Sequence, residues 1–368
     1  MKTTFLRCLI GIITLITWTI TSAQAEIKIA TVGPFTGRNV FRGEQIQQGA
    51  ELAVQDINER GGVLGQQVVL SIVDDACDPE LAVAVAKKLV AERVVFVAGH
   101  VCSGSSIPAS KIYEKAGILM ISPASTNPKL TDEGGDNVFR VVGRDDQQGL
   151  VAGNYLADVW DKKKIAILHD GSTYGKGLAD QTQRQLKKRG ISEALNEAYA
   201  PGARDQSALV TKLQEAKIDV IYIGGYSADA GLIVRQARDR GYNAQVVAGD
   251  AVTNEEFWMI TGEAGNGTLV TFGPDPRVEP AAASVVKKFA DNDFDPVGYT
   301  LHTYAAIQVW AQAAEAAGSL ELEKVVKALR KDRFKTVLGE LDFDDKGDVI
   351  AAGYIWYAWK DGTYKPLP

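Results

Sequence analysis

Short apolar runs that alternate with longer amphipathic segments place the strongest constraint on the fold of this chain. Four such runs, rich in β-branched or other apolar residues, are IKIATV (27–32), VVLSIV (68–73), VVFVAG (94–99) and ILMI (118–121). Residues 45–60 follow the first run and carry Ile46, Ala50, Ala53 and Ile57 at helical spacing. Continuous apolar strands that alternate with helices are typical of parallel sheets covered on both faces. The pattern therefore predicts an α/β, doubly wound parallel sheet.

A second series of the same kind begins after Arg144. Its strands are expected at 164–170, 194–199, 220–225, 245–249 and 267–273, and its helices at 147–160, 176–189, 206–216 and 228–240. A chain of 368 residues exceeds the size at which a single core usually stops growing, so two α/β domains are predicted. The tail extends neither series: helices are expected at 283–291, 303–317 and 321–331, and strands at 338–344 and 354–359.

The first 25 residues have the pattern of a cleaved secretory signal. A cationic start (MKTTFLR) precedes the apolar stretch Leu9–Ile20, and Ala23-Gln24-Ala25 is typical of a cleavage site. Arg7 stands before Cys8, where a lipoprotein signal needs a small residue, so the product is expected to lack a lipid anchor. No later stretch is apolar for long enough to span a membrane. The formal net charge of −6 disfavours nucleic acid or an anionic membrane as a partner.

Two cysteines remain after removal of the signal, Cys77 and Cys102. An even pair in an exported protein favours a disulfide over a catalytic thiol. The sequence carries no P-loop, GxSxG, HExxH or CxxC pattern, and its three histidines are scattered singly. If the protein were an enzyme, the alternative to a disulfide would be a Cys102-dependent hydrolase with His100 or His169 as its base.

Hydroxyl-rich stretches follow two of the predicted strands. Ser103 comes after the strand that ends at Gly99, just before a helix expected to hold Pro108 in its first turn, and SPASTN (122–127) follows 118–121. Ligands of open α/β sheets bind beyond the carboxyl ends of the strands, and the N-terminus of a helix offers free amide groups to an anion. Ser103 and Thr126 are therefore candidates to hold a carboxylate. Ordinary capping and turn chemistry is the alternative.

Several motifs resemble those of the periplasmic leucine/isoleucine/valine-binding proteins of ABC importers. They are GGVLGQQVVLSIVDDACDPELAVAVAKKLV, GHVCSGSSIPAS, GILMISPASTNPKLT, RDDQQG, HDGSTYGKGLA, YIGGYSADAGLIVRQAR and LDFDDKGD. The similarity extends over essentially the whole mature chain. The resemblance implies a type I periplasmic binding protein, in which two α/β lobes joined by three crossings close on a ligand. It places lobe one at 26–144 plus 273–349 and lobe two at 145–272 plus 350–368, and it includes a Cys77–Cys102 pair.

The same resemblance implies which residues hold an amino acid. The carboxylate would meet Ser103 and Thr126, and the ammonium would meet the Ala124 carbonyl and Asp250, where the family more often has glutamate. Tyr174 and Tyr226 would close over the ligand from lobe two, and Tyr299 would lie beside its side chain; for each tyrosine, packing between the lobes is the alternative. Val101 and Ser125, in the same two hydroxyl-rich stretches, complete the expected set.

Arg42 departs from the family pattern, which usually has an aromatic residue in the loop after the first strand. Arginine is a donor shaped for carboxylates rather than an apolar wall. Either Arg42 turns to solvent at the rim of the cleft, or the bound side chain is polar or acidic.

These observations predict a monomeric periplasmic solute-binding protein. It would bind an amino acid without turnover, use no cofactor or metal, and deliver its ligand to an inner-membrane ABC permease. An extracytoplasmic amino-acid sensor is a second alternative, beside the hydrolase.

Overall fold

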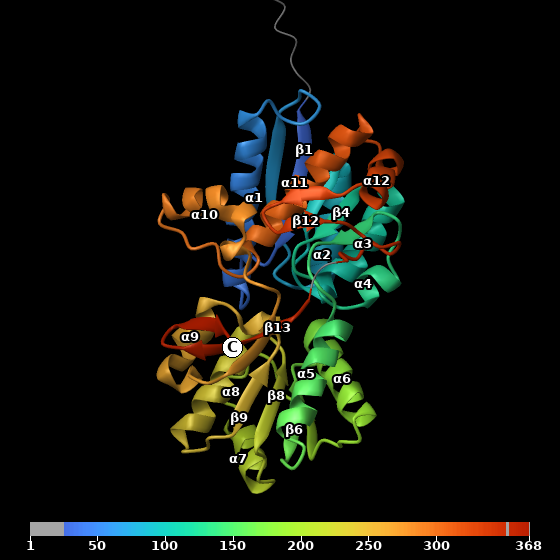
Figure 1. Ribbon diagram of the computed structural model, residues 1–368. Helices are drawn as coiled ribbons and strands as arrows, with labels where there is room; N and C mark the ends of the chain where they lie inside the picture. The colour runs from blue at the N-terminus through green and yellow to red at the C-terminus, as the bar shows by residue number, and fades with distance from the viewer. Residues whose placement is uncertain (1–25, 351–352, 368) are drawn as a thin grey trace, which may run out of the picture.

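The computed structural model describes residues 26–350 and 353–367, so the predicted signal peptide lies outside the described residues. Two lobes stand one above the other in Figure 1, each built around its own sheet. The sheet of lobe one is wholly parallel, in the spatial order β2 (Val68–Asp74), β1 (Ile27–Gly33), β3 (Phe96–Gly99), β4 (Leu119–Ser122) and β5 (Val138–Arg140). The α/β two-lobe fold expected from the sequence is confirmed.

Helices cover both faces of this sheet because side chains of alternate strand residues point to opposite faces. Ile27 and Ile29 of β1 pack into one core and Ala30 and Val32 into the other. The first core contains α1 (Val40–Glu59), α10 (Ala283–Ala290), α11 (Thr300–Ala317) and α12 (Leu322–Lys331); the second contains α2 (Pro79–Ala91), α3 (Ser103–Ala116) and α4 (Lys129–Asp132). The segment that carries α10, α11 and α12 thus completes lobe one, where the rings of Phe96 and Trp310 stack 5.0 Å apart.

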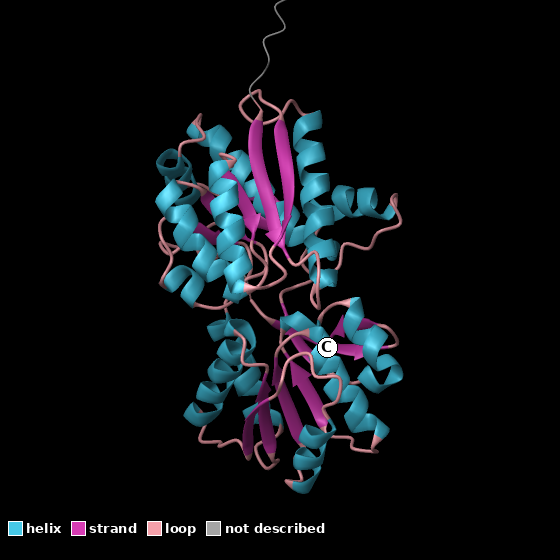
Figure 2. Ribbon diagram, turned by 180° about the vertical axis from the view of Figure 1, so that it is seen from behind, coloured by secondary structure: helices cyan, strands magenta, loops and turns pink. Residues whose placement is uncertain are grey.

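Lobe two has a mixed sheet rather than a purely parallel one. Its order is β14 (Thr363–Pro366), β13 (Ile355–Lys360), β10 (Leu269–Phe272), β9 (Gln245–Ala248), β8 (Val220–Gly224), β6 (Ile165–His169) and β7 (Leu195–Ala198). The last five strands are parallel, whereas β13 and β14 form an antiparallel hairpin added beside β10. The helices around it are α5 (Asp145–Val159), α6 (Thr173–Lys188), α7 (Ser207–Glu215), α8 (Ser227–Asp239) and α9 (Glu255–Thr261). Figure 2 shows them on both sides of the strands.

Some local expectations were wrong. The strand expected at 338–344 is short, since only β12 (Gly339–Leu341) pairs, with β11 (Phe334–Thr336). Pro108 is the sixth residue of α3 and lies beyond its first turn. Helix α1 begins at Val40 rather than near residue 45, so Arg42 belongs to its first turn and not to a loop. The first turn of this helix rests against the segment that follows β1, since a Cβ atom at Gly43 would overlap the Pro34 carbonyl oxygen.

The chain passes between the two sheets three times. It crosses after β5, returns after β10, and crosses again between β12 and β13. The first crossing leads directly from β5 of lobe one to α5 of lobe two. The crossings lie where the two lobes face each other (Figure 1).

Candidate functional site

The lobe-one side of the candidate site is formed by the segments after β3 and β4. Ser103 is the first residue of α3, and its hydroxyl accepts a hydrogen bond from the Asn127 backbone at 3.3 Å. Thr126 is fully buried, and its hydroxyl lies near the Asp145 carboxyl group of α5 without forming a hydrogen bond of good geometry. A buried polar atom left unsatisfied by the protein is costly and marks a place for a ligand or water. The two predicted carboxylate donors are thus brought together, one of them uncommitted.

The neighbouring residues of the predicted set support these two segments. The Ser125 hydroxyl interacts with the Ser106 hydroxyl at 2.6 Å and donates to the Val101 carbonyl at 2.9 Å, so it joins the segments after β3 and β4. Val101 and Ala124 are buried in the same apolar cluster as Tyr299. Ser125 is therefore committed to internal hydrogen bonds, whereas the Thr126 hydroxyl is not.

Asp250 is the centre of the lobe-two side. It begins the short 3₁₀ helix η1 (Asp250–Val252) after β9 and is 2% exposed. Tyr174, from α6, donates its hydroxyl to one carboxylate oxygen at 2.9 Å, and Tyr299, from lobe one, donates to the other. The Tyr226 ring lies 5.2 Å from that of Tyr174. One buried carboxylate is thus oriented by a tyrosine from each lobe.

Arg42 is buried between these aromatic rings, not at the rim. It is 4% exposed, and its guanidinium carbon lies 5.3 Å from the Tyr299 ring centre and 5.5 Å from that of Tyr226. Cation–π contacts at such distances are favourable when desolvated. Burial pulls the pKa of Arg42 down, but the oxygens of Tyr299 and Asp250 outweigh it and the net shift is upward. The expectation of a solvent-facing Arg42 is therefore wrong.

Asp145 and Gln148, on α5, are polar residues of this region to which sequence reasoning assigned no role. Both carboxylate oxygens of Asp145 are buried without a hydrogen bond of good geometry, although the Thr126 hydroxyl lies close enough to counteract part of the rise in the Asp145 pKa. The side-chain oxygen of Gln148 is also buried without a partner. Burial, and then the nearby charge of Asp250, raise the pKa of Asp145 well above its ordinary value. The RDDQQG motif contained both residues, but periodicity shows only that they lie on a helix, not that they face the other lobe.

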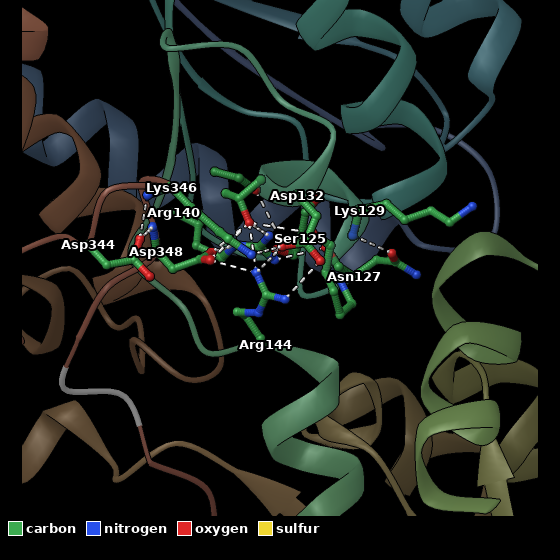
Figure 3. Close-up of polar contacts among 12 residues, drawn as sticks. Ser125, Asn127, Lys129, Asp132, Arg140, Arg144, Asp344, Lys346 and Asp348 are labelled. Atoms are coloured by element: carbon green, nitrogen blue, oxygen red, sulfur yellow. Dashed lines mark hydrogen bonds and ion pairs between the residues drawn. The ribbon is translucent and has the colours of Figure 1, made fainter. Parts of the chain in front are cut away.

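A buried ion-pair network anchors the segment that carries Thr126 to two of the crossings (Figure 3). Arg140, at the end of β5, donates to the backbone carbonyls of Ser125 at 2.9 Å and Asn127 at 3.1 Å. Its Nε pairs with Asp348 at 2.6 Å, and Arg144 pairs with the other Asp348 oxygen at 2.7 Å. The network therefore ties the first crossing, the third crossing and the Ser125–Asn127 segment of lobe one together.

The two lobes touch across the cleft. Arg38 of lobe one pairs with Asp229 of α8 at 3.1 Å, and the Asn127 amide donates to the Thr173 carbonyl at 2.8 Å. A cavity of about 470 Å³ remains at the mouth, lined among others by Arg38, Cys102, Asp170 and Tyr226. These contacts describe a closed arrangement, and of the predicted ligand-binding residues Tyr226 lines this cavity.

The predicted disulfide joins Cys77 and Cys102, whose Cα atoms are 5.4 Å apart. Cys102 directly precedes Ser103 and is the N-cap residue of α3, so the bridge secures the start of this helix. The proposed hydrolase loses its nucleophile because the thiol is consumed. His100 is also committed, with Nδ1 2.6 Å from Asp75 and Nε2 2.9 Å from Tyr113.

Two further properties concern residues 26–350 and 353–367. None of the helices in these ranges combines the length and apolar character needed to cross a bilayer. Over the same ranges, no three acidic, histidine or cysteine side chains are grouped in a way that could hold a metal ion.

Comparison with known proteins places this architecture in a family. A family model described as periplasmic binding protein matches residues 26–363. "Leu/Ile/Val-binding protein homolog 1" of Brucella suis is 48% identical over 343 residues, covering 93% of this chain and 92% of the relative. "Amino acid binding protein" of Pseudomonas aeruginosa is 45% identical, covering 95% and 94%.

Solved structures agree with the sequence relatives. A leucine-binding protein LivK from Thermotoga maritima is similar with a TM-score of 0.86 and 29% identity, covering 93% of this chain and 98% of that one. LivJ from Streptococcus pneumoniae, in complex with isoleucine, has a TM-score of 0.84, 27% identity and the same coverage. With its two α/β lobes, its closed cleft and a family match that spans residues 26–363, this chain belongs to the periplasmic binding protein family.

Proposed function

We propose that this protein captures a free α-amino acid between its lobes and delivers it to an ABC importer. The observation that carries the proposal is the enclosed polar set made by both lobes. The uncommitted Thr126 hydroxyl and Ser103 at the start of α3 suit a carboxylate, and Asp250, oriented by Tyr174 and Tyr299, suits an ammonium group.

The names of the relatives support leucine, isoleucine and valine as the first ligands to examine, since the Brucella suis relative is a Leu/Ile/Val-binding protein homolog and LivJ is in complex with isoleucine. LivJ is described as a substrate-binding protein of a branched-chain amino acid transporter, which supports a transporter as the partner. A periplasmic location is proposed from the family description and from the predicted signal peptide.

We further propose that closure turns on the three crossings, near Arg144, Gly273 and residues 349–350, and that the lobes divide there as the sequence predicts. The Arg140–Asp348–Arg144 network supports this because it joins two crossings to the Thr126 loop. A ligand stabilises the closed state only through its greater affinity for that state, and contacts with both lobes supply this difference.

A thermal-shift screen of the twenty amino acids, followed by isothermal titration of those that stabilise the protein, tests the function. A ligand at a hundred times its Kd adds about 2.7 kcal/mol to the free energy of unfolding. Binding of at least one free amino acid, with loss of affinity for its α-methyl ester, is expected. Absence of stabilisation by every amino acid would contradict the proposal.

A further inference from the structure

We infer that Arg42 makes the side-chain end of this site selective for an amino acid whose side chain carries a hydrogen-bond acceptor, a carboxylate or an amide carbonyl. This inference rests on the proposed function and specifies its substrate class. It concerns the part of the ligand that reaches Arg42, beyond the ammonium and carboxylate groups that Asp250 and Thr126 are proposed to hold.

The position of Arg42 is set by packing and not by a salt bridge. Its helix, α1, lies against α11 so closely that a Cβ atom at Gly49 would overlap the Thr300 carbonyl oxygen. Tyr299 is the N-cap residue of α11, so this close contact brings Tyr299 beside the first turn of α1. Tyr226 covers Arg42 from lobe two. The guanidinium therefore faces the interior of the closed site.

The hydrogen bonds of Arg42 are incomplete. Its guanidinium hydrogen-bonds the Tyr299 side chain, but its Nε is buried and has no acceptor. The carboxylate oxygens of Asp250 accept from Tyr174 and Tyr299. Glu256 of α9 is the other carboxyl group that Arg42 influences, and burial raises its pKa to about 7. Arg38, by contrast, already has Asp229 as its partner. Among residues 26–350, Arg42 thus stands out as a buried guanidinium next to the site that no carboxylate pairs with directly.

The charges of the closed site favour an acceptor in the ligand. With leucine, Asp250 pairs with the ammonium, and the Nε of Arg42 is left without an acceptor. With a side-chain carboxylate or amide, each charged group has a partner and the guanidinium gains an acceptor. A hydrogen bond to a charged group contributes about 1.5–3 kcal/mol, which corresponds to about tenfold to a hundredfold in affinity.

Leucine and asparagine form a suitable ligand pair because their side chains have the same shape, and glutamine and glutamate extend the acceptor by one methylene. We would titrate these four, with aspartate, into wild type and Arg42→Leu. Arg235→Gln is the matched control, since Arg235 is exposed on α8, where its partner is Asp239, and its loss changes the net charge equally. Circular dichroism and urea unfolding would establish that the variants fold.

At least one acceptor-bearing ligand is expected to bind wild type as tightly as leucine or more tightly. Arg42→Leu should shift the affinity ratio toward leucine by about tenfold or more, and Arg235→Gln should leave it unchanged. If leucine binds wild type at least tenfold more tightly than all four others, the inference is overturned while the proposed function stands, and this holds even if Arg42→Leu does not fold. If no amino acid binds wild type, the proposed function itself is wrong.

Discussion

Replacing Asp250 by asparagine should remove the counter-charge of the ligand while preserving the shape of the site. Asp250 is 2% exposed, and asparagine can still accept a hydrogen bond from Tyr174, so the lobes should fold unchanged. Breaking a buried ion pair by removing one partner costs about 3–5 kcal/mol. At about 1.4 kcal/mol for each factor of ten, the Kd for an amino acid should rise by about two to three and a half orders of magnitude.

Two further variants separate charge from hydrogen bonding. Tyr174→Phe removes one donor to the carboxylate and should weaken binding by about tenfold, in line with the loss of a single hydrogen bond to a charged group. Asp250→Glu keeps the charge and should remain within about tenfold of wild type. Isothermal titration with the best ligand of the amino-acid screen measures all three. A change of less than about threefold for Asp250→Asn would refute the assignment of Asp250 to the ammonium.

Four other properties are open to direct measurement. Replacing Cys77 and Cys102 by serine should lower the free energy of unfolding by about 3.5 kcal/mol, because the bridge closes a sequence separation of 25, and urea unfolding that shows no loss would contradict this. Burial lowers the pKa of His302 to about 4, so its contribution to the free energy of unfolding is present above pH 6.5 and is lost as the pH falls toward 4. This loss is about 2 kcal/mol between pH 7 and pH 5, and the variant His302→Gln should not show it. The pKa of Asp145 is shifted upward, so its contribution to the free energy of unfolding is present at low pH and is lost as the pH rises. Asp145→Asn should therefore be more stable than wild type at pH 8. Equal pH profiles of the two proteins would show that Asp145 is solvated. Small-angle scattering should show a smaller radius of gyration with saturating ligand, and an unchanged radius would argue against closure at the three crossings.

Sequence reasoning reached the fold because the information it needed is local. The period of apolar residues identifies strands and helices, and two βα series that are too long for one core predict two lobes. Ser103 and Thr126 could be proposed because the carboxyl ends of parallel strands meet at one edge of a sheet. The disulfide followed from two cysteines in an exported chain. The antiparallel pairing of β13 could not be read in this way, since nothing in a short apolar run specifies its direction or its partner.

Only the tertiary structure decided how the site is oriented. Tyr174 and Tyr299 are 76 and 49 residues from Asp250, yet both donate to its carboxylate, because the packing of two lobes sets these contacts. From the sequence alone, the Arg42 side chain could face either the solvent or the ligand. Its burial depends on the close approach of α1 to α11 and on a tyrosine from the other lobe, and such long-range packing leaves no periodic trace in the chain.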